Sequence, residues 1–82
     1  MVTDEKVVET AASAAHELVF SRLASSSVDD LDVTVTFEDG VLEVDVYLLA
    51  PDSDVDVEQV ADDATLAAQA AVDSLFAEEP DT

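Results

Sequence analysis

Hydrophobic residues recur along the chain with two different periods. In the first segment, up to Leu23, they return every three or four positions, which is the period of an amphipathic helix. Thr3 is placed to cap this helix, and Asp4 and Glu5 follow where acidic side chains favour the N-terminal end of the helix dipole. We therefore predict a first helix ending near Leu23. Its apolar stripe consists of Val8, Ala11, Ala12, Ala15, Leu18 and Val19.

The period then changes to two, which indicates strands that are buried on one face. Two alternating runs, residues 31–38 and 41–49, flank Asp39-Gly40. Asp-Gly favours a type I′ turn, because both central positions of that turn need a positive φ. A two-residue turn would pair Val35 with Val44 and keep the apolar side chains on one face. We therefore predict an antiparallel hairpin with one apolar face and one largely hydrated face.

The helical period returns after a polar connection, from Val57 to about Ala77. Asp56 is a suitable N-cap, and Gln59 stands three residues later, as in a capping box. We expect the stripe of this helix to face the sheet and Phe76, at its edge, to join the core. The stripe consists of Val57, Val60, Ala61, Ala64, Ala67, Ala68, Ala71, Val72 and Leu75.

These elements predict an α+β fold of the order α-β-β-α, in which both helices pack on one face of the hairpin. We expect one domain over residues 1–77 and an acidic, flexible tail over residues 78–82. A two-stranded sheet leaves two open rims, and open rims invite pairing with another chain. We therefore expect the sheet to be extended by dimerisation.

Charge adds a condition to this picture. The 82 residues include 21 Asp and Glu but only 2 Lys and Arg, and no basic residue follows Arg22. Repulsion among these carboxylates opposes compaction of the chain unless salt screens it, so we expect the protein to need high salt for stability. The acid-rich, Ala- and Val-rich composition resembles that of haloarchaeal proteins. High net charge is also a signature of disorder, but here the apolar residues keep structured periods.

The residue types present argue against most catalytic chemistry. The chain has no cysteine, one glycine and one histidine, so thiol catalysis, a Gly-rich phosphate loop and a His-pair metal site are unavailable. The acids at Asp52, Asp54 and Asp56 begin like a calcium loop, but Val57 and Asp63 stand where that loop needs glycine and glutamate. We expect no cofactor, no metal and no enzymatic activity.

The scarcity of basic residues and of long apolar runs limits the possible partners. Direct nucleic-acid binding is disfavoured because only Lys6 and Arg22 could contact phosphates. The acidic N-terminus is unlike a secretory signal, and no apolar run has the length of a membrane span. We therefore expect a cytoplasmic protein that does not bind membranes.

Apolar residues outside the predicted stripes are the candidates for a partner interface. Phe20 projects away from the stripe of the first helix, one turn beyond His16, and Leu66 points away from the stripe of the second helix. Tyr47 and Leu49 fall on the hydrated face of the hairpin. Scattered surface apolar residues are common, whereas a cluster on an anionic surface marks an interface. The predicted interface residues are His16, Phe20, Tyr47, Leu49 and Leu66.

Two segments carry a family resemblance. The run LDVTVTFEDGVLEVDV from Leu31 to Val46, followed by ADDATLAAQAAV from Ala61 to Val72, resembles a small archaeal family of unknown function. That family is distantly similar to the dimerising Pcc-type subunit of the KEOPS complex, which makes the threonylcarbamoyl modification on adenosine of certain transfer RNAs. The Pcc-type subunit resembles a β-α-β-β-α protein, whereas Met1-Val2-Thr3 is too short for a full first strand.

This resemblance implies a non-catalytic role, in which the protein pairs with a related small subunit and supports a catalytic one. We therefore expect a structural subunit of a cytoplasmic complex of KEOPS type that forms a homodimer or a heterodimer. The alternative is an acidic binding module that imitates nucleic acid and occupies a basic partner.

Overall fold

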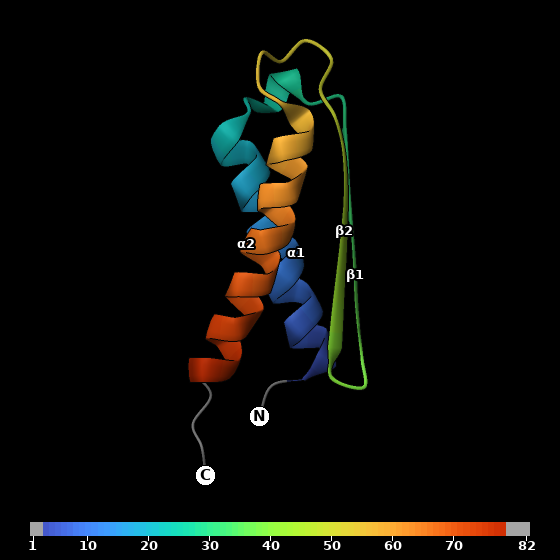
Figure 1. Ribbon diagram of the computed structural model, residues 1–82, viewed down its shortest axis with the longest axis vertical. Coiled ribbons are helices and arrows are strands. Elements are labelled where there is room, and N and C mark those ends of the chain that lie inside the picture. The colour runs from blue at the N-terminus through green and yellow to red at the C-terminus, as the bar shows by residue number, and fades with distance from the viewer. Residues whose placement is uncertain (1–2, 79–82) are drawn as a thin grey trace.

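The computed structural model describes residues 3–78 and has two layers. An antiparallel hairpin forms one layer, and two helices that run in opposite directions and cross each other form the second (Figure 1). The predicted α-β-β-α order and α+β class are confirmed. The elements are α1 (Asp4–Arg22), a short 3-10 helix η1 (Ser25–Ser27), β1 (Asp30–Glu38), β2 (Val41–Leu49) and α2 (Val57–Glu78).

The C-terminal boundary differs slightly from the prediction. Helix α2 extends through Glu78, which the sequence pattern assigned to a flexible tail. The reason is that a helix continues through polar residues until a residue such as proline stops it, and Pro80 is the first such residue after Val57. The remainder of the predicted tail, residues 79–82, lies outside the described residues.

The hairpin has the predicted turn and register. Asp39 and Gly40 both adopt positive φ, 52° and 78°, as a type I′ turn requires. Val35 lies opposite Val44 across the two strands, and the strands pair over their whole length. Alternate residues therefore face the helices, and the others form the opposite side of the sheet.

Side-chain caps begin both helices. Thr3 Oγ1 accepts a hydrogen bond from the Lys6 N–H at 3.1 Å. Asp56 Oδ1 accepts from the N–H groups of Glu58 and Gln59, at 3.1 and 3.4 Å. The predicted capping box is wrong in its second half, because the Gln59 amide donates forward to Asp63 Oδ1 at 3.0 Å. A carboxylate one turn ahead on the same helix face competes for the glutamine side chain.

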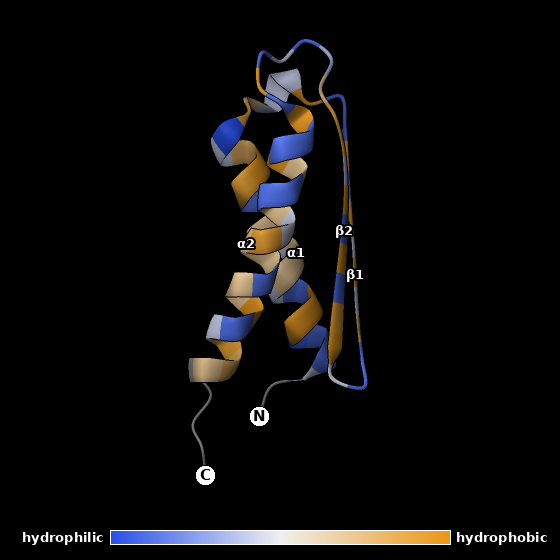
Figure 2. Ribbon diagram, viewed as in Figure 1, coloured by the Kyte–Doolittle hydropathy of each residue, from blue (hydrophilic) through white to orange (hydrophobic). Residues whose placement is uncertain are grey.

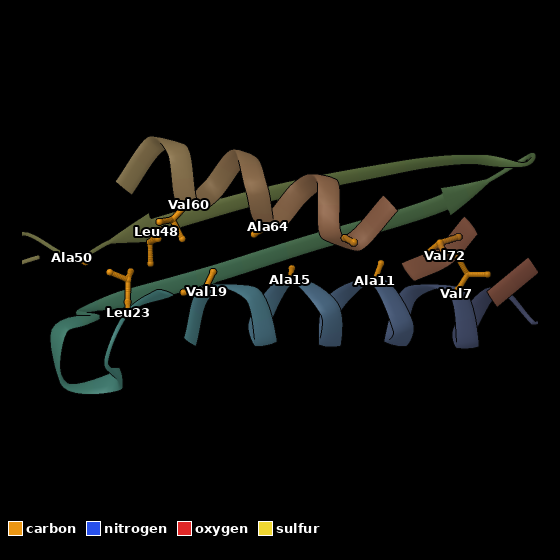
Figure 3. Packing of buried hydrophobic residues seen from close by; sticks show 11 residues of the cluster. Val7, Ala11, Ala15, Val19, Leu23, Leu48, Ala50, Val60, Ala64 and Val72 are labelled. Carbon is orange, nitrogen blue, oxygen red and sulfur yellow. The ribbon is translucent and has the colours of Figure 1, made fainter. Parts of the chain in front are cut away.

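The helices meet along two ladders of small residues spaced four positions apart. Figure 3 places Val7 beside Val72 at one end and Val19 towards Val60 at the other. Alanines occupy the middle of both ladders, where Figure 1 shows the helices crossing, and valines occupy the ends, where they diverge. Ridges of i, i+4 residues pack closely when the crossing carries only methyl groups. The fully buried ladders are Val7, Ala11, Ala15 and Val19, and Val60, Ala64 and Ala68, with Val72 almost fully buried.

This packing corrects two predictions. Val7 is fully buried on α1, whereas Val8 and Ala12 of the predicted stripe are only half-buried. The contact between the two helices is the most extensive that either helix makes. The buried residues of α2 therefore face α1 more than the sheet (Figure 3). Two adjacent apolar residues, Val7 and Val8, satisfy the helical period almost equally, so the position of the second helix decides which is buried.

The molecule is long and thin, measuring about 49 × 20 × 17 Å. Two layers of this thickness surround few side chains completely, since layers pack roughly 10 Å apart. On the helix-facing side of the hairpin only Leu48 is buried, at 8% exposure. The other residues of that side are partly exposed although they contact the core, namely Leu31, Val33, Val35, Phe37, Leu42, Val44 and Val46.

Candidate interaction surface

Every residue on the side of the hairpin that faces away from the helices is exposed, and the two rows of this side differ. We call this side the outer face. The row from β1 is polar throughout, with Asp30, Asp32, Thr34, Thr36 and Glu38. The row from β2 alternates in character, with Val41, Glu43, Asp45, Tyr47 and Leu49. Register places Tyr47 opposite Asp32, and Val41 opposite Glu38, so β2 carries the apolar surface of this face.

The inner face of the hairpin is incompletely covered near its turn. Phe37 of β1 contacts Phe76 of α2, with ring centroids 6.1 Å apart and planes tilted by 38°. Phe76 nevertheless remains 44% exposed, so the prediction that it joins the core is wrong. It lies in the last turn of α2, at the end where the two helices diverge (Figure 1).

A hollow lies along the rim of β2. It is bounded by Leu42 and Val44 of β2 and by Gln69 of α2, and it reaches the outer face at Glu43, Asp45, Thr34 and Thr36. Its only internal hydrogen bond between side chains runs from Thr36 Oγ1 to Glu43 Oε1 at 3.4 Å. The hollow therefore joins half-buried apolar side chains to two carboxylates at an open strand rim.

The five predicted interface residues are all exposed but do not form one patch. Tyr47 and Leu49 lie together on the outer face and are 54% and 43% exposed. Phe20 and His16 belong to α1, and Leu66 belongs to α2, so these three lie in the other layer. Phe20 is 45% and Leu66 61% exposed. The sequence identified exposed residues correctly, but the tertiary structure separates them.

Two further exposed apolar residues were not among the predicted interface residues. Val41 is 59% exposed next to the turn, at the end of the outer face away from Leu49. The alternating run placed Val41 on this face together with Tyr47 and Leu49. Phe76 was assigned to the core because it borders the apolar stripe of α2, but it is 44% exposed.

One ion pair joins the two helices at the end opposite the hairpin turn. Arg22 Nη1 of α1 lies 2.8 Å from Asp63 Oδ2 of α2. The hydrogen bond from Arg22, with a second from Gln59, lowers the pKa of Asp63 below its ordinary value. This carboxylate stabilises the helix pair as an anion, and it is unsuited to act as a proton donor near neutral pH.

A second hollow is lined by residues of both helices. Polar side chains of α1 line most of it, and Ala71 closes it from α2. Within residues 3–78 no buried side-chain nitrogen or oxygen lacks a hydrogen-bond partner. In the same residues no group of three His, Asp or Glu side chains comes together to hold a metal ion. The hollow therefore presents no assembled polar site.

Hydrophilic and hydrophobic positions occur together in both layers (Figure 2). Hydrophilic segments recur along both helices and at the hairpin turn, and hydrophobic and hydrophilic positions alternate on the strands (Figure 2). Neither described helix is long and apolar enough to cross a membrane.

Solved structures place this fold in a class of small archaeal α+β proteins. A crystal structure from Thermococcus onnurineus NA1 is similar with a TM-score of 0.76 and 29% identity, covering 95% of this chain and 82% of that one. A solution structure of a hypothetical protein from Methanothermobacter thermautotrophicus also gives 0.76, with 22% identity and coverage of 99% and 96%. The second likeness concerns the fold alone.

Sequence comparison then gives the family. An uncharacterised protein of Natronomonas pharaonis is 54% identical over 74 residues, which are 90% of this chain and 88% of that protein. Residues 3–75 match the family described as Protein of unknown function (DUF3194). The chain belongs to this family, and the prediction of a small archaeal family of unknown function is confirmed.

Proposed function

We propose that this protein is a non-catalytic interaction subunit that pairs with another protein chain by extending its two-stranded sheet. The observation that carries the proposal is the half-covered hairpin. Seven of its helix-facing apolar residues remain partly exposed, and each strand has one unpaired rim. An added strand would satisfy the backbone groups of a rim and cover the apolar side chains beside it.

The chemistry of the described residues supports a structural role. Asp63 has its pKa lowered by Arg22, which is the pattern of an ion pair that fastens two helices. An acid prepared for proton transfer would instead have its pKa moved towards neutrality. The polar side chains at the hollow beside β2 are carboxylates, hydroxyls and one amide at the open surface.

The proposed setting is a complex of KEOPS type, in which the chain pairs with a related small subunit. This setting rests on the sequence resemblance of the hairpin and second helix. The proposal includes a cytoplasmic location. It also includes a requirement for high salt, because 17 of the 21 acids follow Arg22 and no base accompanies them.

The test is reconstitution in molar potassium chloride. The tagged chain is mixed with purified KEOPS subunits of a haloarchaeon, and the products are separated by size exclusion with light scattering. A stoichiometric complex with the Pcc-type subunit is the expected result. A mass that stays at that of the tagged monomer with every subunit and at every concentration would contradict pairing.

The same experiment separates the alternative function. A basic nucleic-acid-binding protein that forms a one-to-one complex, and is displaced by nucleic acid, would favour an acidic mimic. A particle of twice 8.6 kDa without any partner would show a homodimer and leave the role as a dimerising subunit in place.

A further inference from the structure

We infer that the partner strand adds beside β2, not β1, and that it is an amphipathic strand with apolar residues on one side and Lys or Arg on the other. This inference rests on the proposed function and specifies where pairing occurs and what chemistry the partner brings. It comes from three observations on the rims of the hairpin.

The first observation is that the two outer-face rows differ in apolar residues. The β1 row contains three acids, two threonines and no apolar residue, and charged rows of this kind protect a strand edge from pairing. The β2 row contains two acids, and it also contains Val41, Tyr47 and Leu49, which are 59%, 54% and 43% exposed. A strand beside β2 would therefore lie next to apolar side chains, whereas a strand beside β1 would lie next to polar side chains only.

The second observation is the hollow beside β2. Leu42 and Val44 of the inner face and Gln69 of α2 line it, and it extends over the outer face to Thr34 and Thr36 of β1. Side chains of an added strand would alternate between the helix side and the outer face. The inward set would continue the apolar face at Leu42 and Val44, and the Gln69 amide could bond to that strand's backbone.

The third observation is the charge of β2, and it defines the partner. Glu43 and Asp45 project from the middle of β2 at the hollow, and the chain has no base after Arg22 to neutralise them. A neighbouring strand places its outward side chains roughly 4.5–5.5 Å from these two, where opposite charges stabilise pairing. The outward residues facing Glu43 and Asp45 are therefore basic.

A second copy of this chain is the less suitable occupant of the β2 rim. Self-pairing of two β2 strands would bring two copies each of Glu43 and Asp45 to one seam, with no base on either hairpin. Like charges on adjacent strands destabilise a sheet, and the −19 charge of each copy adds long-range repulsion. A strand with basic outward residues meets neither obstacle.

The test is an NMR titration of the full, nitrogen-15-labelled chain with synthetic peptides. The probe is a blocked nine-residue peptide of alternating valine and lysine, which matches β2 in length. Potassium chloride is held at the lowest concentration that leaves the circular dichroism of the chain unchanged. Amide shifts confined to β2 and the part of α2 near Gln69 are expected. Shifts centred on β1, or no shifts, would overturn the inference.

Two control peptides test whether general attraction to an anionic surface explains the amide shifts. One has the same composition with all lysines at one end, and the other alternates valine and glutamate. Neither should shift the β2 amides, because the first lacks the two-sided pattern and the second lacks the positive charge. Equal shifts with the block peptide would show that charge alone attracts the probe and would contradict strand addition.

Matched variants test the two carboxylates. We expect the double variant Glu43→Gln with Asp45→Asn to weaken binding of the alternating lysine peptide roughly two- to tenfold. The control, Asp32→Asn with Glu38→Gln, removes the same charge from β1 and should change the affinity by less than about twofold. Equal losses in both double variants would overturn the assignment to β2.

The outcome is distinguishable from failure of the proposed function. Reconstitution can yield a complex whose assembly is weakened by the β1 variants. That result would support the proposed role as an interaction subunit but would place the interface at β1. A homodimer whose amide shifts on dilution map to β2 would give that rim to a second copy and overturn the partner chemistry.

Discussion

At the scale of single residues, the turn shows most directly how local chemistry fixes the structure. Asp39 and Gly40 both lie at positive φ, a region that residues with a Cβ enter at a cost. The turn sets the register of the strands, and with it the side of the sheet on which every hairpin residue lies. These two residues therefore made the hairpin predictable from sequence.

Replacing Gly40 by alanine should lower the free energy of unfolding by about 1–2 kcal/mol. The loss comes from the backbone alone, since a Cβ at this position would meet no atom within 4 Å. Gly40→Asn is the matched control and should lose less, because asparagine tolerates positive φ. Urea unfolding in molar potassium chloride measures both. Equal losses for alanine and asparagine would contradict the explanation.

Asp63 gives a prediction about pH. Its pKa in the folded chain lies below the ordinary value of 3.8, so the stability it adds is present above that pH and is lost as the pH falls through the folded value. Removing the guanidinium by Arg22→Gln should raise the carboxyl titration midpoint of Asp63 towards 3.8, as measured by carbon-13 NMR.

The control for this titration is Lys6→Gln, which removes one positive charge from the N-terminal part of α1, away from Asp63. The midpoint of Asp63 should stay unchanged in it. A similar rise in both variants would show that net charge, and not the 2.8 Å contact, lowers the pKa.

At the scale of elements, the close approach of the two helices depends on the small side chains that lie between them. Alanine ladders let the helices approach closely, but each alanine removes little apolar area from water, at roughly 25 cal/mol per Å². Periodicity predicted both helices and most of the buried face of α2. It could not decide between Val7 and Val8, since that choice depends on where the other helix lies.

Enlarging one rung of a ladder should separate the helices. Ala68→Leu places a branched side chain where the alanine is fully buried, and we expect a loss of about 1–3 kcal/mol in the free energy of unfolding. Ala70→Leu on the same helix is the control, because Ala70 is exposed and its change should stay within about 0.5 kcal/mol. Thermal and urea unfolding of both variants provide the measurement, and equal losses would contradict the close approach of the ladders.

At the scale of the whole molecule, a thin two-layer shape and a −19 charge act together. The shape limits how much apolar surface is buried, and the charge adds repulsion that the small core must overcome. Screening shortens the reach of each carboxylate to roughly 3 Å at 1 M salt. Stability and pairing should therefore both depend on ionic strength.

The free energy of unfolding should rise between about 0.2 M and about 2 M potassium chloride, because salt screens repulsion among the carboxylates. The triple variant Asp30→Asn, Asp32→Asn and Glu38→Gln should show a weaker rise, since it removes all three charges of one row. Urea titrations at several salt concentrations measure the slope. An equal slope in the variant would assign the salt effect to apolar burial instead of charge screening.

The sequence by itself determined the elements, the turn, the helix caps and the register, because each follows from the geometry of the backbone and of residues close in the chain. Tertiary structure decided which ladder residues are buried, left Phe76 exposed and placed Phe20 and Tyr47 in different layers. These outcomes depend on how distant elements cross and diverge, and the spacing of residues along the chain does not record that arrangement.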